Sequence, residues 1–447
     1  MGLGRLIRVL LCAAALTVSA VFGQNASSEA NRWSRQKLPE LQVKHMSLLN
    51  APQFRGQQEN GDNGGTTTLC GIECQSSLPP MDLAEQERIL GYETMYENGT
   101  RTHSDVSLQA FNKTSTHPPA GRTRSRRQVY GADGRFVISD SHFVTNYPFS
   151  TAVRLSTGCS GVLVSPKHVL TAAHCIHDGR DYLDGARRLR VGVLQLKTKG
   201  RRPGGRRGGR RRAGRRKKEN GEEQLMEEGD EQNSIDGDVA RKGGGRRRGR
   251  KGEGGGKSPN RIRRSAELKK LPVFRWTRVK KLQIPQGWIR DKSSSVSPDY
   301  DYAVLELKRP VKQKHMELGV APPATPLARI HFSGFDSDKS LQDGGGKEKV
   351  IYRFCSVAKE SDDLMYQHCD AQRGATGAGV YVRLKREGGT RKGKWQRRVI
   401  GVFSGHRWVE VEGGEQRDFN VAVRITPAKY VQICHWIRGD PSLCKEV

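Results

Sequence analysis

Three short motifs in this sequence carry the side chains that nucleophilic catalysis needs. The motif TAAHC supplies an imidazole at His174, DYAVLEL opens with a carboxylate at Asp301, and GATGAG carries a hydroxyl at Thr376. An imidazole can take the proton of an attacking hydroxyl, and a carboxylate can hold that imidazole in the productive tautomer. The three motifs therefore predict a hydrolase centre, or the remains of one.

The order of these motifs, histidine then aspartate then hydroxyl, resembles that of the chymotrypsin-like serine proteases. The resemblance points to a secreted branch of that family that includes pseudoproteases. It implies an all-β fold, the chymotrypsin/trypsin-like double β-barrel with a C-terminal helix, preceded by a poorly ordered pro-region. It also implies that His174 is the general base and that Asp301 orients it, with Asp299 as the alternative carboxylate. No cofactor and no metal are expected.

Two residues depart from the pattern of the family. Thr376 stands where the nucleophilic serine is expected, and its β-branched side chain places a methyl group where the substrate carbonyl needs space. An internal threonine also lacks the free amine that serves N-terminal threonine nucleophiles as a base. Ala375 replaces the aspartate that pairs with the freed amino terminus in trypsin-like zymogens. We predict a catalytically inactive homologue, with a weakly active endopeptidase that uses Thr376 as the alternative.

The parts of the site that bind a substrate are predicted to remain. Backbone N–H groups of Gly374 and Thr376 can form an oxyanion hole, because that feature needs no particular side chain. Asp370 lies at the spacing of a primary-pocket residue, and Ser404 and Gly405 resemble the strand that pairs with the substrate backbone. The expected ligand is an extracellular protein or peptide.

The elements that must position these motifs are strands. Short β-branched runs separated by Gly, Pro and Ser, such as TAVRLSTGCSGVLV, LRVGVLQL and RVIGVFSG, are typical of an all-β domain. The last segment, ITPAKYVQICHWIR, instead repeats apolar residues at a spacing of three and four. We predict a terminal helix there.

The start of the chain and its cysteines indicate secretion. Residues 1–23 combine Arg5 and Arg8 with an apolar run and a small residue, Gly23, as in a signal peptide, and no later stretch is long enough to span a bilayer. The eight remaining cysteines form an even set suited to disulfides, and their spacing fits no common zinc finger. The resemblance and proximity pair them as Cys159–Cys175, Cys355–Cys369, Cys434–Cys444 and Cys70–Cys74.

Residues 24–127 read as a glycosylated pro-region, and residues 128–447 as the trypsin-like (peptidase S1) domain. The pro-region holds all three N-x-S/T sequons, at Asn25, Asn98 and Asn112. It ends in RTRSRR, a pattern that looks like a furin-type processing site with cleavage after Arg127. The alternative is an exposed basic turn that is not cut.

A basic insert, residues 197–264, interrupts the predicted domain. It contains 24 Lys and Arg against 10 Asp and Glu, so it holds +14 of the net charge of +31. Its glycines and like-charge blocks predict disorder. Arginine clusters bind dense polyanions, so we expect heparan sulfate as a partner; nucleic acid is disfavoured because no aromatic residues interleave the arginines. RIRRS supplies a second processing site after Arg264. A matrix-associated, heparin-binding structural protein with a vestigial cleft stays open as an alternative.

Overall fold

The computed structural model describes residues 38–49, 81–109, 134–138, 141–198, 270–289, 297–322, 329–337, 349–385, 395–411 and 414–444. All of these except Thr198 belong to one compact unit, formed by Met1–Lys197 together with Lys270–Val447. The second unit, Thr198–Lys269, is described only at Thr198, so the predicted basic insert lies almost wholly outside the described residues. No helix among the described ranges is long and apolar enough to cross a membrane.

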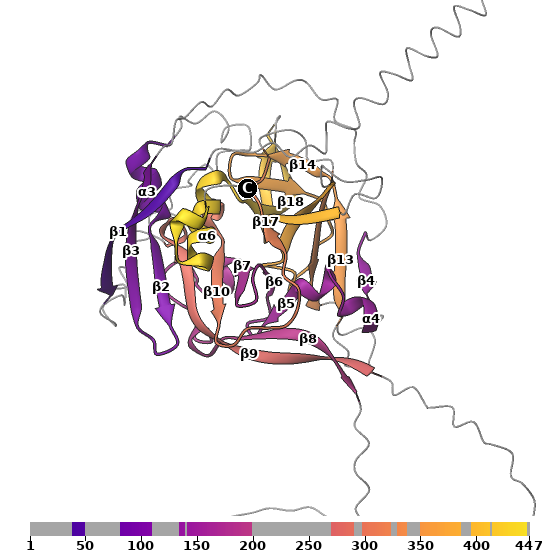
Figure 1. Cartoon of the computed structure of the whole chain (residues 1–447). Helices are drawn as coiled ribbons and strands as arrows, with labels where there is room; N and C mark the ends of the chain where they lie inside the picture. Colours follow the sequence, from indigo (N-terminus) through magenta and orange to yellow (C-terminus); the bar gives the residue numbers. More distant parts are fainter. Residues whose placement is uncertain are drawn as a thin grey trace, which may run out of the picture. The chain divides into compact units, whose positions relative to one another are not determined.

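Six strands close into the first barrel. Their order is β9-β10-β7-β6-β5-β8, and a further pairing between β8 and β9 completes the ring (Figure 1). Its interior is filled by β-branched and aliphatic side chains such as Val153, Leu170 and Leu305, none of which is exposed to solvent. The strands are β5 (Ala152–Leu155), β6 (Ser160–Leu163), β7 (His168–Thr171), β8 (Arg190–Thr198), β9 (Lys270–Pro285) and β10 (Ala303–Leu307).

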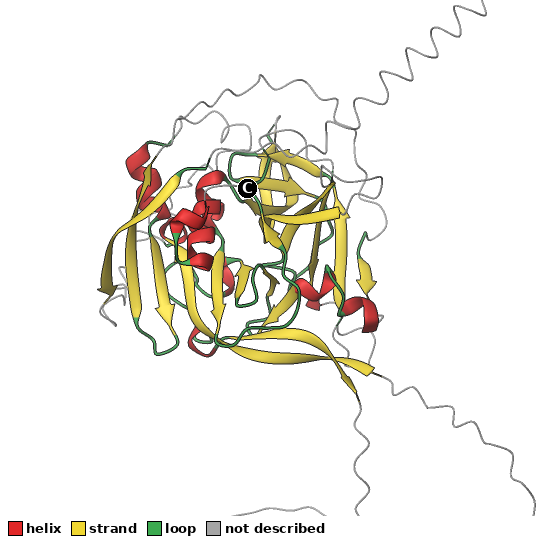
Figure 2. Cartoon of the chain, in the orientation of Figure 1, coloured by secondary structure: helices red, strands yellow, loops and turns green. Residues whose placement is uncertain are grey.

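A second sheet forms the other half of the double-barrel fold. Its order is β14-β15-β18-β17-β16-β12-β13-β4, with the short β11 paired to β17. Figure 2 shows strands dominating this half as well. The strands are β4 (Phe136–Ile138), β11 (Glu317–Leu318), β12 (Ile330–Gly334), β13 (Val350–Cys355), β14 (Val357–Glu360), β15 (Leu364–Gln367), β16 (Gly379–Lys385), β17 (Trp395–Val411) and β18 (Glu415–Arg424). The predicted fold class, an all-β chymotrypsin-like double barrel, is confirmed.

The predicted terminal helix is α6 (Pro427–Arg438). Thr426 caps it by accepting a hydrogen bond from the Lys429 backbone, Pro427 occupies its first turn, and Gly439 ends it in the left-handed conformation at φ 75°. Shorter helical segments connect the strands: α4 (Ser141–Val144), η1 (Phe149–Thr151), η2 (Ala173–Cys175), η3 (Ala186–Arg188), η4 (Gln286–Trp288) and η5 (Pro298–Tyr300). A further one, η6 (Pro441–Cys444), follows α6.

Four ordered elements lie in residues 24–127, where the sequence indicated only a pro-region. They are β1 (Glu40–Leu49), α3 (Leu83–Leu90), β2 (Tyr92–Tyr96) and β3 (Arg101–Gln109). The strands extend the sheet of the first barrel outward in the order β1-β3-β2-β9 (Figure 1). They escaped prediction because β1 and β3 carry many polar residues, although alternate positions of β3 are buried. Residues 24–37, 50–80 and 110–127 lie outside the described ranges.

Candidate active site

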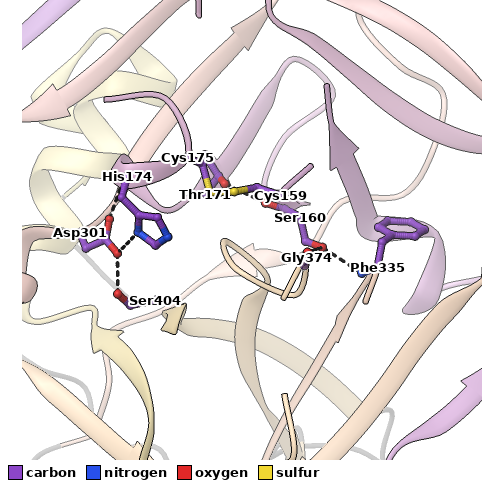
Figure 3. Close-up of a disulfide and its surroundings, with 9 residues drawn as sticks. All are labelled: Cys159, Ser160, Thr171, His174, Cys175, Asp301, Phe335, Gly374 and Ser404. Atoms are coloured by element: carbon purple, nitrogen blue, oxygen red, sulfur yellow. Dashed lines mark hydrogen bonds and ion pairs between the residues drawn. A yellow bond between two sulfur atoms is a disulfide. The ribbon is translucent and has the colours of Figure 1, made fainter. Parts of the chain in front are cut away.

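His174, Asp301 and Ser404 form one hydrogen-bonded network (Figure 3). Nδ1 of His174 lies 2.6 Å from Oδ2 of Asp301, and the backbone N–H of His174 donates to Oδ1 at 2.9 Å. The hydroxyl of Ser404 donates to Oδ2 of the same carboxylate at 2.5 Å. Asp301 is therefore the carboxylate that holds the imidazole, whereas Asp299 accepts a hydrogen bond from Ser297 instead.

Strand register brings the histidine and the aspartate together. His174 lies in η2, which follows β7 directly, and Asp301 immediately precedes Tyr302 and strand β10. Strands β7 and β10 are antiparallel neighbours, with Thr171 opposite Ala303, so the end of one strand meets the start of the other. Ser404 belongs to β17 of the second sheet.

The network shifts the pKa values of both ionisable groups. Burial opposes protonation of His174, but the charge of Asp301 and the hydrogen bond to it outweigh burial, so the pKa of His174 is raised. Burial also opposes ionisation of Asp301, and here the imidazole, the Ser404 hydroxyl and the His174 backbone together lower the pKa of the carboxyl group. The pair thus favours an ionised aspartate beside an imidazole that protonates readily.

The loop that carries Thr376 is held by backbone contacts on both sides. The carbonyl of Thr376 accepts a hydrogen bond from the Ser160 backbone at 2.7 Å, and the N–H of Gly377 donates to the carbonyl of Phe403 at 2.8 Å. The hydroxyl of Ser160 donates to the carbonyl of Gly374, also at 2.7 Å (Figure 3). Within the described ranges, no hydrogen bond joins the Thr376 hydroxyl to His174.

Comparison with known proteins matches these features to one family. The model of the Trypsin family matches residues 138–213. Inactive serine protease 35 of Homo sapiens is 47% identical over 419 residues, which cover 92% of each chain, and that of Macaca mulatta is 48% identical over 92% of this chain and 93% of its own. Serine protease 23 of Rattus norvegicus is 40% identical over 93% of this chain and 92% of its own. This chain belongs to the trypsin-like serine protease family, in the group that contains these relatives.

A solved structure of a Glu endopeptidase also aligns with this trypsin-like chain. The alignment covers 69% of this chain and 99% of the endopeptidase, at 16% identity and a TM-score of 0.38.

Three disulfides brace the trypsin-like fold with the pairing that the sequence predicted. Cys159–Cys175 ties the start of β6 to η2, which carries His174 (Figure 3). Cys355–Cys369 closes the segment ahead of the Thr376 loop, and Cys434–Cys444 ties α6 to η6. Cys70 and Cys74 lie outside the described residues.

One of the predicted pocket residues, Asp370, lines a small cavity. A cavity of about 200 Å³ is lined by Asp370 and neighbours that include Arg329, His368 and Cys369, but by neither Ser404 nor Gly405. Asp370 adopts a left-handed backbone at φ 53°, and its carboxylate accepts a hydrogen bond from the backbone of Gly134 at 3.0 Å. A role for Asp370 in specificity stays a prediction.

Other predicted sites fall partly outside the described residues. Asn98 is exposed at the turn between β2 and β3, and its side chain accepts a hydrogen bond from the backbone of Thr100. The sequons at Asn25 and Asn112 lie outside the described ranges, as do the processing sites after Arg127 and Arg264. Among the described side chains, no group of three His, Cys, Asp or Glu is placed to hold a metal ion.

A buried ion cluster, which the sequence did not predict, lies beside the Thr376 loop. Asp336 pairs with Arg353, which is fully buried, and with Arg135 at 3.2 Å. Burial raises the pKa of Asp336 despite the two guanidinium groups. The next residue, Ser337, donates from both its backbone and its hydroxyl to the carbonyl of Arg373. The cluster thus anchors the segment that holds the start of the loop.

Proposed function

We propose that this chain is a secreted serine protease homologue without useful peptidase activity, which acts by binding a protein or peptide in its cleft. The observation that carries the proposal is a threonine at position 376 in a loop fixed on both sides by Ser160 and Phe403. Because the loop backbone cannot easily shift, the added methyl group must occupy space near the attacking oxygen. A misplacement of about 1 Å can cost on the order of 100-fold in rate.

Two further observations support loss of activity. The relatives at 46–48% identity carry the name inactive serine protease 35. Ala375 supplies no carboxylate to pair with a new amino terminus, so cleavage after Arg127 cannot order the loop by the ion pair that trypsin-like zymogens use. The order of the loop therefore rests on its backbone contacts to Ser160 and Phe403 and not on processing.

Binding can persist without catalysis, because it depends on different atoms. Strand β18 pairs with β17 as far as Val411, whereas β16 pairs with it only as far as Val402, so among the described strands the part of β17 around Gly405 has a partner strand on one side only. An added Cβ at Gly405 would meet nothing within 4 Å. An extended peptide can pair with such a strand through backbone hydrogen bonds alone. We therefore expect an extracellular protein or peptide ligand along β17.

Peptidase turnover and fluorophosphonate labelling test this function. The form cut after Arg127 is compared with Thr376→Ser and with Thr376→Ser combined with His174→Ala. We expect labelling and turnover only in Thr376→Ser, and loss of both when His174 is removed. Wild-type turnover that falls in Thr376→Ala would instead establish a threonine-nucleophile endopeptidase.

A second candidate function, retention on heparan sulfate, is favoured by the charge of residues 197–264. A polycation gains affinity for a polyanion by releasing counterions, so binding should weaken steeply with salt. Elution from immobilised heparin is measured for the full chain and for a variant that lacks residues 200–264. Equal elution of the two proteins would rule out the insert as the binding segment.

A further inference from the structure

Strand β2 joins the N-terminal region to the first barrel by sheet pairing. Its five residues pair antiparallel with β9, from Tyr92 opposite Pro285 to Tyr96 opposite Lys281. Backbone hydrogen bonds continue beyond both ends of the strand, from Gln286 to the carbonyl of Gly91 at 2.6 Å and from Glu97 to that of Lys280 at 2.8 Å. We call residues 38–49 and 81–109 the N-terminal segment. It continues the barrel sheet without a break.

Apolar side chains of the N-terminal segment belong to the core of the barrel. They lie in one cluster with Leu282 and Ile284 of β9, and each is at most 4% exposed: Leu41, Leu90, Tyr92, Met95, Val106 and Leu108. Apolar surface buried to this degree is strongly unfavourable to expose to water. Release of the segment would expose both sides of this contact.

The N-terminal segment also covers helix α6. The side-chain amide of Gln432 donates to the carbonyl of Leu90, and the Tyr92 hydroxyl lies 3.3 Å from Nε2 of His435. The ring of Tyr92 meets that of Trp436 edge-on, with centroids 5.4 Å apart. Seven of the 12 residues of α6 are buried, so other parts of the chain must cover most of the surface of this helix. The N-terminal segment supplies part of that cover.

Ion pairs join the N-terminal segment to the first barrel at the edge of their contact surface. Glu97 accepts from Lys308 at 2.9 Å. Arg101, whose side chain is 16% exposed, pairs with Glu93 of its own segment at 2.6 Å and reaches Asp181 of the barrel at 3.1 Å. Charge complementarity at the rim adds specificity to the apolar contact.

The segment reaches the candidate active site through η4. Ile89 of α3 packs so closely on Gly287 that an added Cβ would lie 2.5 Å from its Cγ2 atom. Trp288 follows in the same short helix; its indole N–H donates to the carbonyl of His177 at 3.1 Å, and its ring centroid lies 6.2 Å from that of His174. We call Gly287 and Trp288 the wall beside His174. This wall packs against Ile89, which precedes the predicted processing site.

We propose that the N-terminal segment stays bound after cleavage following Arg127, so that the processed protein is a two-piece complex whose wall beside His174 needs both pieces. The complex is non-covalent within one molecule. Six cysteines form the three disulfides described above, all on the C-terminal side of the cut, and Cys70 and Cys74 both lie on the N-terminal side. Processing then produces a heterodimer from one chain and releases no inhibitor.

The first test cuts a full-length variant in which residues 124–127 are replaced by a site for a sequence-specific protease, so that cleavage is certain. We expect two bands on a non-reducing denaturing gel and one co-eluting peak in native size exclusion. An N-terminal piece that elutes by itself in native buffer would overturn the proposal. This readout does not depend on peptidase activity, so it stands apart from the proposed function.

Two variants of the cut protein test whether the described contacts hold the pieces together. Tyr92→Ala removes the ring that packs on α6, and Tyr96→Ala, on the same strand but less buried, is its matched control. We expect Tyr92→Ala to separate the pieces at a lower guanidinium concentration than Tyr96→Ala does. Equal separation would contradict this contact surface.

Hydrogen exchange tests, in the uncut protein, whether the wall beside His174 depends on the N-terminal segment. Ile89→Ala removes the side chain that packs on Gly287, whereas Leu83→Ala changes an exposed residue of the same helix. We expect faster amide exchange in residues 286–289 for Ile89→Ala and none of this change for Leu83→Ala. Unchanged exchange in Ile89→Ala would show that the wall does not depend on the N-terminal segment.

Discussion

The Asp301 carboxylate accepts two hydrogen bonds from His174, one from its backbone N–H and one from its ring. The carboxylate accepts a third hydrogen bond from Ser404, and Asp301 is fully buried. Holding the residue at two points fixes both the position of the backbone and the tautomer of the ring. The part of the site that activates a nucleophile is thus assembled, although the residue at position 376 is a threonine.

The first prediction tests whether this arrangement is competent. In the Thr376→Ser background, Asp301→Asn keeps the shape of the side chain but can stabilise the wrong imidazole tautomer. In the serine protease triad this exchange costs about 10⁴-fold in kcat, and we expect a loss of that order here. Steady-state turnover of the two variants measures it. A loss of less than about tenfold would show that Asp301 does not orient His174.

The raised pKa of His174 predicts a pH-dependent stability. A group whose folded pKa is raised contributes stability that is fully present below its unfolded value, about 6.5, and is lost as the pH rises through the folded value. The thermal midpoint of the wild type should therefore exceed that of His174→Gln by less and less as the pH rises from 6 to 9.

His177 provides the control for this measurement. Burial lowers its pKa to about 4, so it stays neutral in the folded protein across the same range, whereas the unfolded chain releases its proton near the ordinary value of about 6.5. The thermal midpoint of the wild type relative to His177→Gln should therefore rise from pH 6 to about pH 8 and then level off, which is the opposite direction to His174. If the wild-type advantage over His174→Gln does not shrink with rising pH, the ion pair with Asp301 does not stabilise the fold.

The sequence predicted the elements whose pattern is local. Strands β5 to β8, β10, β16 and β17 have β-branched runs bounded by turn residues, and the catalytic motifs lie next to such runs: His174 after β7, Asp301 before β10 and Thr376 before β16. The capped start of α6 at Thr426 and Pro427 is equally local. These features need no knowledge of distant contacts.

Features that depend on tertiary contacts could not be predicted in this way. The buried charges of Asp336 and Arg353 look like surface residues until β12 and β13 are paired. Strand β3 buries polar residues, including Ser104, because β1 and β2 flank it. Ser404 was expected to line a pocket, and its hydrogen bond to Asp301 follows only from the meeting of the two sheets.

The buried cluster beside the Thr376 loop supplies a stability prediction. Asp336→Asn leaves the buried guanidinium of Arg353 facing a neutral amide, and breaking a buried ion pair from one side costs about 3–5 kcal/mol. Because Ser337 holds the carbonyl of Arg373, amide exchange in residues 373–376 should also rise. Chemical denaturation and hydrogen exchange measure the two effects.

The exposed ion pair of Arg417 with Glu415 is the control for this loss. Exposed pairs contribute little, so Arg417→Gln should leave the denaturation midpoint unchanged. A midpoint for Asp336→Asn as high as that of Arg417→Gln would mean that the buried cluster does not stabilise the fold.

The last prediction separates crowding from backbone strain at two glycines of similar conformation. Gly377 has φ 85° and Gly158 has φ 96°, so an alanine at either site adopts a left-handed backbone at a cost of roughly 1–2 kcal/mol. At Gly377 the new Cβ would also collide with Thr171 and the carbonyl of Ser160, whereas at Gly158 it would meet nothing within 4 Å. Overpacking of this kind adds about 1–3 kcal/mol, so Gly377→Ala should lose that much more unfolding free energy than Gly158→Ala in urea titrations. Equal losses would mean that the Thr376 loop can shift away from β6 and β7, and the argument that its fixed backbone excludes the threonine methyl group would fail with it.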